Sequence, residues 1–262
     1  MDKIKIAKKA QVTLFVILAI VIVAGILVYY IWLRPTMIQP VGEKLKLEVC
    51  VDDVVKEALD KLGKQGGYSN PDFFYLYQDN KVGYLCYTNL YYKPCDAQKP
   101  MLRAHVEEQL KKDIAEKVQT CYDTSIQDLQ SKGYDVTGKE RPDLKVSVVE
   151  DSIAVEIDAP VVIKKDEATK RFTKFTIKTS SRIYDLLMIA TSIMQAEMQY
   201  GDSDTATMMD FYPETLIDKF KQDDGSTIYV LENSESKEKF YFAVRSLVFP
   251  VGYGFDSPEG FE

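Results

Sequence analysis

An uncharged apolar run, residues 12–33, lies close to the N-terminus of the chain. An α-helix rises about 1.5 Å per residue, so this run would reach about 33 Å as a helix, enough to cross the hydrocarbon core of a bilayer. A cleaved secretory signal has a shorter apolar core followed by a small-x-small site, which residues 28–35 lack. We therefore expect a retained transmembrane helix at 12–33.

The charges that flank the run predict its orientation. Four lysines precede it within residues 1–11, whereas Arg34 is the cation that follows closely. Positive charge beside a span favours the cytoplasmic side, and aromatic rings such as that of Trp32 favour the membrane interface. We expect residues 1–11 to be a basic cytoplasmic segment of a single-pass protein of the cell membrane, with the C-terminal part outside the cell.

The outer part of the chain is acidic. Residues 1–34 hold five cations and one acid, and the whole chain has a formal net charge of −7, so residues 35–262 carry −11. Such a domain repels nucleic acids and anionic lipids. We expect the bilayer to be contacted through residues 12–33, a protein or glycan partner or self-association outside the cell, and no nucleic-acid partner.

Four cysteines lie beyond the apolar run: Cys50, Cys86, Cys95 and Cys121. An even number of cysteines on the oxidising side of a membrane suggests two disulfides, for which three connectivities are possible. The favoured one pairs Cys86 with Cys95 around a local loop and Cys50 with Cys121 between two helices. Unpaired buried thiols are the alternative.

Motifs for catalysis or metal binding are weak in this sequence. The one histidine, His105, has no neighbouring motif, and a zinc-deaminase interpretation of Pro94-Cys95 fails because Gln98 stands where a second cysteine is needed. Phosphate-loop, dinucleotide-binding, nucleophile-elbow and zinc-protease signatures do not occur. We expect no enzyme activity, cofactor or metal, and we expect His105 to be a packed or surface residue.

Periodicity outside the run predicts an α+β fold, with helices packed on antiparallel sheets and hairpins. After an extended linker at 34–44, the domain spans 45–248, with a possible seam at 133–142 and a flexible tail at 249–262. Helices are predicted at 45–62, 100–122 with a continuation to 129, 182–200 and 213–221. Strands are predicted at 73–77, 82–87, 144–148, 153–157, 161–163, 172–177, 227–231 and 240–248.

Nine aromatic residues lie between Tyr68 and Tyr92. Dense aromatic residues can bind glycans or a partner protein, because rings give a large contact area at low entropic cost. They also favour strands, so packing within a hairpin is the preferred interpretation. Tyr91 and Tyr92 are the residues that we expect to be exposed and to form an interaction surface.

The segment from Lys8 to Phe15, followed by the apolar run, resembles the start of archaeal proteins with a class III, type IV pilin-like signal. The resemblance implies processing between Ala10 and Gln11, which would leave the apolar helix on the mature protein. Pilins usually carry glutamate where this chain has Phe15, and this difference favours an anchor over a filament subunit.

A second resemblance covers more of the chain. The same N-terminus, together with Cys50-Val51-Asp52-Asp53-Val54 and the segment Leu62–Tyr68, is similar to uncharacterised single-pass surface proteins of DPANN archaea. These features together predict a membrane-anchored surface protein with an acidic interaction domain that serves envelope structure, adhesion or cell–cell contact. A pilin-like filament subunit is the alternative, and an extracellular carboxylate-dependent hydrolase is the third hypothesis.

Overall fold

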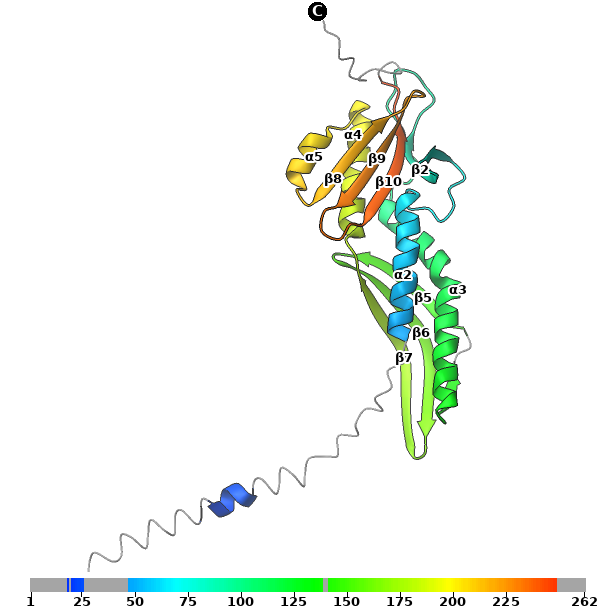
Figure 1. Ribbon diagram of the computed structural model, residues 1–262, viewed down its shortest axis with the longest axis vertical. Coiled ribbons are helices and arrows are strands. Elements are labelled where there is room, and N and C mark those ends of the chain that lie inside the picture. The colour runs from blue at the N-terminus through cyan, green and yellow to red at the C-terminus, as the bar shows by residue number, and fades with distance from the viewer. Residues whose placement is uncertain (1–17, 19, 26–46, 139–140, 249–262) are drawn as a thin grey trace, which may run out of the picture. The chain divides into compact units, whose positions relative to one another are not determined.

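The computed structural model describes residues 18, 20–25, 47–138 and 141–248 (Figure 1). The chain divides into two compact units, Met1–Lys44 and Leu45–Glu262. Residues 20–25 of the expected membrane helix are helical. Among the described residues, no helix has both the length and the apolar character needed to cross a membrane. Several expected features lie outside the described residues: the segment 1–11 with Ala10 and Gln11, most of 12–33, the linker 34–44 and the tail 249–262.

The second unit alternates helices and strands. Its described helices are α2 (Leu47–Lys64), α3 (Leu102–Ser131), α4 (Ile183–Tyr200) and α5 (Thr205–Phe211). Its described strands are β1 (Phe74–Tyr77), β2 (Asn80–Tyr87), β3 (Asp96–Ala97), β4 (Asp135–Gly138), β5 (Asp143–Val149), β6 (Ser152–Lys165), β7 (Ala168–Ser180), β8 (Thr215–Lys221), β9 (Ser226–Asn233) and β10 (Lys239–Arg245).

The strands form two sheets. The first has the order β1-β2-β10-β9-β8, and β3 also pairs with β2. β2 and β10 run parallel, whereas the other neighbours in this sheet are antiparallel. In the second sheet, β6 pairs with β7 over most of its length and with β5 and then β4 over successive parts. The α+β prediction is confirmed, although the first sheet is mixed rather than wholly antiparallel.

Helices α2 and α3 pack against each other along regular apolar stripes. In α3 the buried side chains recur every four residues from Leu102 to Val118, the spacing that keeps them on one face of a helix. The Cys50–Cys121 disulfide joins the two helices, with the Cα atoms 5.9 Å apart. This is the interhelical pairing that was favoured from the sequence.

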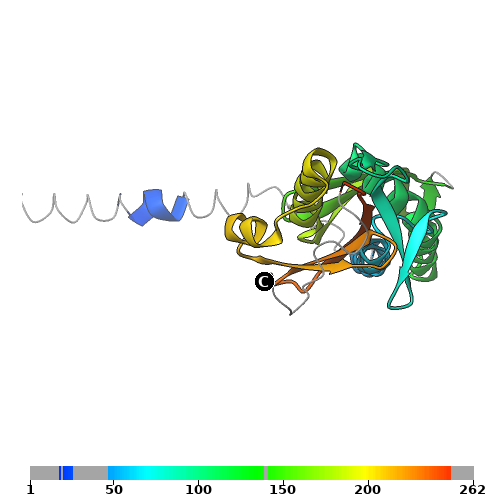
Figure 2. The same ribbon diagram turned by 90° about the horizontal axis from the view of Figure 1, so that it is seen from above.

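A large hydrophobic core holds the unit together, and a second, smaller cluster lies on β2, β9 and β10. The large core contains buried residues of α2, α3 and α4 and of both sheets, with Ile157 in β6 and Phe242 in β10 among the fully buried side chains. Figure 2 shows α4 lying against one face of the first sheet. Leu45–Glu262 is a single compact unit, and its large core includes residues on both sides of 133–142.

Two local predictions were wrong. The strands expected at 153–157 and 161–163 are one strand, β6, whose pairing with β7 shifts register between Asp158 and Val161. Pro160 lies within this irregularity, where a residue without an N–H group is tolerated. The helix expected at 213–221 is strand β8: buried Thr215 and Ile217 alternate there with exposed Leu216 and Asp218, and β8 pairs with β9.

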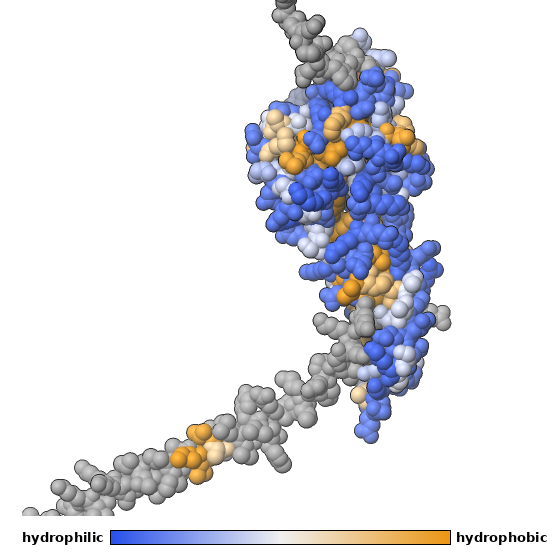
Figure 3. All heavy atoms as spheres, in the orientation of Figure 1, coloured by the Kyte–Doolittle hydropathy of each residue, from blue (hydrophilic) through white to orange (hydrophobic). Residues whose placement is uncertain are grey.

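The exposed surface of the unit is mainly hydrophilic on the side shown in Figure 3, with small separate hydrophobic patches. One of these patches lies over α5 and β8 in that view. The exposed apolar side chains of this region include Phe211 and Leu216, with 75% and 51% of their surface accessible. Small exposed apolar patches of this kind are normal on folded domains.

Candidate interaction surface

The two tyrosines selected from the sequence lie on the segment between β2 and β3. β2 ends at Tyr87 and β3 begins at Asp96. The Cys86–Cys95 disulfide closes this segment, with the Cα atoms 5.3 Å apart, and both cysteines are buried. This is the local pairing favoured from the sequence. We call residues 88–95 the tyrosine loop.

Backbone hydrogen bonds attach the tyrosine loop to the chain that continues beyond β10. The Thr88 N–H donates to the Arg245 carbonyl at 2.9 Å, and the Tyr92 N–H donates to the Leu247 carbonyl at 2.6 Å. In the opposite direction, the Leu247 N–H donates to the Lys93 carbonyl at 3.1 Å. The loop therefore has fixed backbone contacts along its length in addition to its disulfide.

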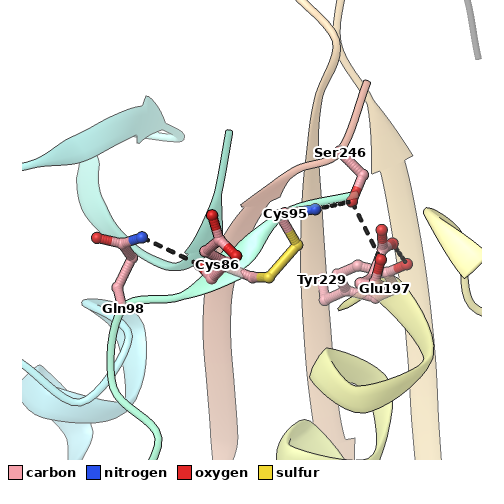
Figure 4. Close-up of a disulfide and its surroundings, with 7 residues drawn as sticks. Cys86, Cys95, Gln98, Glu197, Tyr229 and Ser246 are labelled. Carbon is pink, nitrogen blue, oxygen red and sulfur yellow. Dashed lines mark hydrogen bonds between the residues drawn. A yellow bond between two sulfur atoms is a disulfide. The ribbon is translucent and has the colours of Figure 1, made fainter. Parts of the chain in front are cut away.

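Figure 4 shows a further support beneath the loop. The Cys95 N–H donates to the Ser246 hydroxyl at 3.2 Å, and that hydroxyl donates to the Glu197 carbonyl in α4 at 3.3 Å. The Tyr229 hydroxyl, from β9, donates to the Glu197 side chain at 2.5 Å. Glu197 is only 2% exposed, and burial raises the pKa of its carboxyl group. The loop, α4 and β9 are thus linked through buried and half-buried polar groups.

The side chains at the tip of the loop point into solvent. Leu90 is 54% exposed, Tyr91 65% and Tyr92 78%. The exposure expected for the two tyrosines is therefore present in the structure, and Leu90 adds an aliphatic neighbour. Large rings held on a rigid support lose little conformational entropy on binding, which is why tyrosine is common in binding surfaces.

Tyr92 has a backbone conformation that rarely suits a side chain. Its φ angle is +61°, in the left-handed region. Non-glycine residues pay about 1–3 kcal/mol for such sparsely populated conformations, and they persist where the surrounding contacts determine them. The hydrogen bond from the Tyr92 N–H to Leu247 is such a contact.

We predict that Tyr92→Gly changes the free energy of unfolding by less than about 0.5 kcal/mol, because relief of the left-handed strain offsets the greater freedom of glycine in the unfolded chain. Tyr91 is not among the residues with positive φ, so Tyr91→Gly should cost about 1 kcal/mol. Urea unfolding of both variants checks the pair. A larger loss for Tyr92→Gly than for Tyr91→Gly would contradict the strain argument.

Most of the other aromatic residues of this region pack, as preferred from the sequence. The ring of Phe73 stacks on that of Tyr84 and meets the edge of Tyr87, with both centroid distances 4.6 Å. The Tyr75 hydroxyl donates to the side-chain oxygen of Gln222 at 3.1 Å. The ring contacts lie within the hairpin region, and the Tyr75 bond links β1 to the turn after β8, although Phe73 remains 48% exposed.

His105 is a packed residue of α3. Its ring meets the ring of Tyr68 edge-on, with the centroids 4.5 Å apart. Burial, helped by the positive charge of Lys99, lowers the pKa of His105 to about 4, so the imidazole is neutral at pH 7. This placement fits the expected packing role.

Sequence reasoning missed the polar support beneath the loop. Glu197 follows Ile189 and Ile193 at four-residue spacing on the buried side of α4, and an acid in register with apolar residues is a signal that could have suggested a buried carboxyl group. Ser246 offers no comparable signal, because its role depends on the fold. Comparisons with protein-family models, with curated proteins and with solved structures found no match to this chain.

Proposed function

We propose that this chain is a single-pass protein of the cell surface whose outer domain binds a partner through the tyrosine loop. The observation that carries the proposal is the exposure of Leu90, Tyr91 and Tyr92 on a segment fixed by a disulfide and by backbone hydrogen bonds. A pre-ordered contact surface loses less entropy on association than a mobile one. Envelope structure, adhesion and cell–cell contact are roles that such a surface can serve.

Two further features support this function. The two disulfides suit an oxidising compartment such as the outside of a cell. The apolar run at 12–33 has the length and the flanking charge of an anchor that leaves the C-terminal part outside.

The position of the tyrosine loop within Leu45–Glu262 suits an outward contact. Near the start of α2, Cys50 is bonded to Cys121, which lies well beyond the middle of α3. The helix between Leu102 and Cys121 is about 28 Å long at the usual rise per residue. β3 follows the loop and leads into the opposite end of α3, so the loop lies near the end of α3 that is far from the start of α2. Figure 1 shows the same separation between the start of α2 and the segment that joins β2 to β3.

The membrane and surface parts of the proposal are tested on whole cells. The epitope-tagged full chain should sediment with membranes, and protease added to intact cells should remove the C-terminal tag but spare an N-terminal one. A chain recovered in the soluble fraction, or protected from external protease, would overturn the proposed function.

The binding part is tested with the full chain in nanodiscs, labelled with a fluorophore and mixed with cell envelopes of the source organism. The double variant Tyr91→Ser/Tyr92→Ser should bind at least tenfold more weakly, because it removes the two most exposed rings of the loop. Phe211→Ser removes a ring of similar exposure from α5 and should bind like the wild type. Equal losses in both variants would show that the loop is not the contact surface.

A further inference from the structure

The tyrosine loop differs in charge from the domain that carries it. Its sequence, Thr-Asn-Leu-Tyr-Tyr-Lys-Pro-Cys, contains no acidic residue and one cation, Lys93, whereas residues 35–262 together carry a net charge of −11. Lys93 is exposed beside Tyr92. The side chain of Arg245 donates to the Thr88 carbonyl at 3.1 Å and so places a second cation at the base of the loop. The loop itself therefore adds no acidic side chain that would repel anionic lipids, and the exposed Asp96 follows directly after it.

Two backbone N–H groups at the loop tip are already hydrogen-bonded. The Leu90 N–H donates to the Thr88 hydroxyl at 3.1 Å, and the Tyr92 N–H donates to the Leu247 carbonyl. Unpaired backbone groups are what make irregular segments costly to place in an apolar environment. These two N–H groups therefore need no new partner when the loop tip leaves water.

We infer that the tyrosine loop inserts Leu90, Tyr91 and Tyr92 into the interface of a second bilayer, not the one that holds residues 12–33. The inference rests on the proposed function and names the partner as lipid. Tyrosine rings prefer the headgroup region, leucine adds apolar contact beneath it, and Lys93 can reach a lipid phosphate. The adjacent Leu-Tyr-Tyr side chains stand out from the fold, an arrangement that suits entry into a soft surface.

The attachment formed by one loop is weak and reversible. A single fatty acyl chain gives only marginal membrane binding, and three side chains bury less apolar surface than that. Several anchored copies on one membrane raise the effective concentration of loops at the facing membrane and strengthen the attachment without any new contact. The expected role is contact between two membranes that carry many copies.

The test uses two vesicle populations, one holding the full chain and the other free of protein, both made of phosphatidylcholine with a minor share of phosphatidylglycerol. The chain has one tryptophan, Trp32, in its anchor, so Tyr91→Trp adds a second indole at the loop tip. Brominated lipid placed only in the protein-free vesicles should quench the introduced indole at position 91, and energy transfer between dyes in the two populations should report docking. Leu90→Ser/Tyr92→Ser in the same background should lower docking and quenching at least tenfold, and Phe211→Ser should not.

The outcomes separate the lipid partner from the other partners. Quenching from the protein-free vesicles supports insertion. Docking that requires the chain in both populations, without quenching, would overturn the lipid inference in favour of self-association. Absence of docking together with tyrosine-dependent binding to envelopes would overturn it in favour of a protein or glycan partner and leave the proposed function standing.

Discussion

Removing the Cys50–Cys121 disulfide is expected to lower the free energy of unfolding by about 4 kcal/mol. The two cysteines are 71 residues apart in sequence, and closing a loop of this length restricts the unfolded chain strongly. At about 2–4 °C per kcal/mol for a domain of this size, Cys50→Ala/Cys121→Ala should melt about 8–16 °C below the wild type. Thermal and urea unfolding of the full chain measure both quantities.

A mild reductant supplies the matched control. Cys50 is exposed, whereas Cys86 and Cys95 are buried, so the interhelical disulfide should be reduced first. Reduction should lower the melting temperature of the wild type to that of Cys50→Ala/Cys121→Ala and leave the variant unchanged. If peptide mapping shows Cys50 and Cys121 alkylated while the wild type keeps its melting temperature, the disulfide does not stabilise the domain.

The three long helices, α2, α3 and α4, and the Cys86–Cys95 disulfide could be predicted from the sequence because their signals are local. The four-residue spacing from Leu102 to Val118 identifies α3, and the cysteine of each helix falls where the two stripes can meet. Cys86 and Cys95 flank a short segment after a strand, so their pairing follows from proximity. Tyr91 and Tyr92 follow the predicted hairpin and need no strand partner, which is why their exposure could be predicted.

The missed features depend on long-range pairing. β2 and β10 are parallel neighbours, and Cys86 in β2 pairs in register with Val244 in β10. β2 lies in the first part of the domain and β10 is its last strand, so no local periodicity can predict that they are neighbours. Segment 215–221 contains four apolar or β-branched residues whose spacing fits a short helix as well as a strand, and pairing with β9 decides the outcome. The support beneath the tyrosine loop is of the same kind, because Ser246 meets Cys95 only in the folded domain.

The second large effect is expected at Glu197, beneath the tyrosine loop. Glu197→Ala should cost about 3 kcal/mol, because it empties a buried site and leaves the hydroxyl of Tyr229, itself fully buried, without its acceptor. Glu197→Gln keeps an oxygen that can accept this hydrogen bond and should cost less than about 1 kcal/mol at acidic pH. Urea unfolding compares the two variants. A glutamine variant as unstable as the alanine variant would show that loss of the hydrogen bond from Tyr229 does not cause the destabilisation.

The pH dependence of the free energy of unfolding tests the burial of Glu197 more directly. Burial raises the pKa of Glu197 above the usual 4.5, against the smaller lowering effects of the Tyr229 hydrogen bond and the Lys219 charge. The folded protein therefore keeps this proton when the unfolded chain has lost it, so the stabilisation is complete below the unfolded pKa and falls as the pH rises through the folded pKa. Glu197→Gln cannot titrate, and it should gain stability relative to the wild type from pH 4 to pH 8. A difference between the two proteins that stays constant over this range would show that folding does not raise the pKa of Glu197 and would contradict the prediction.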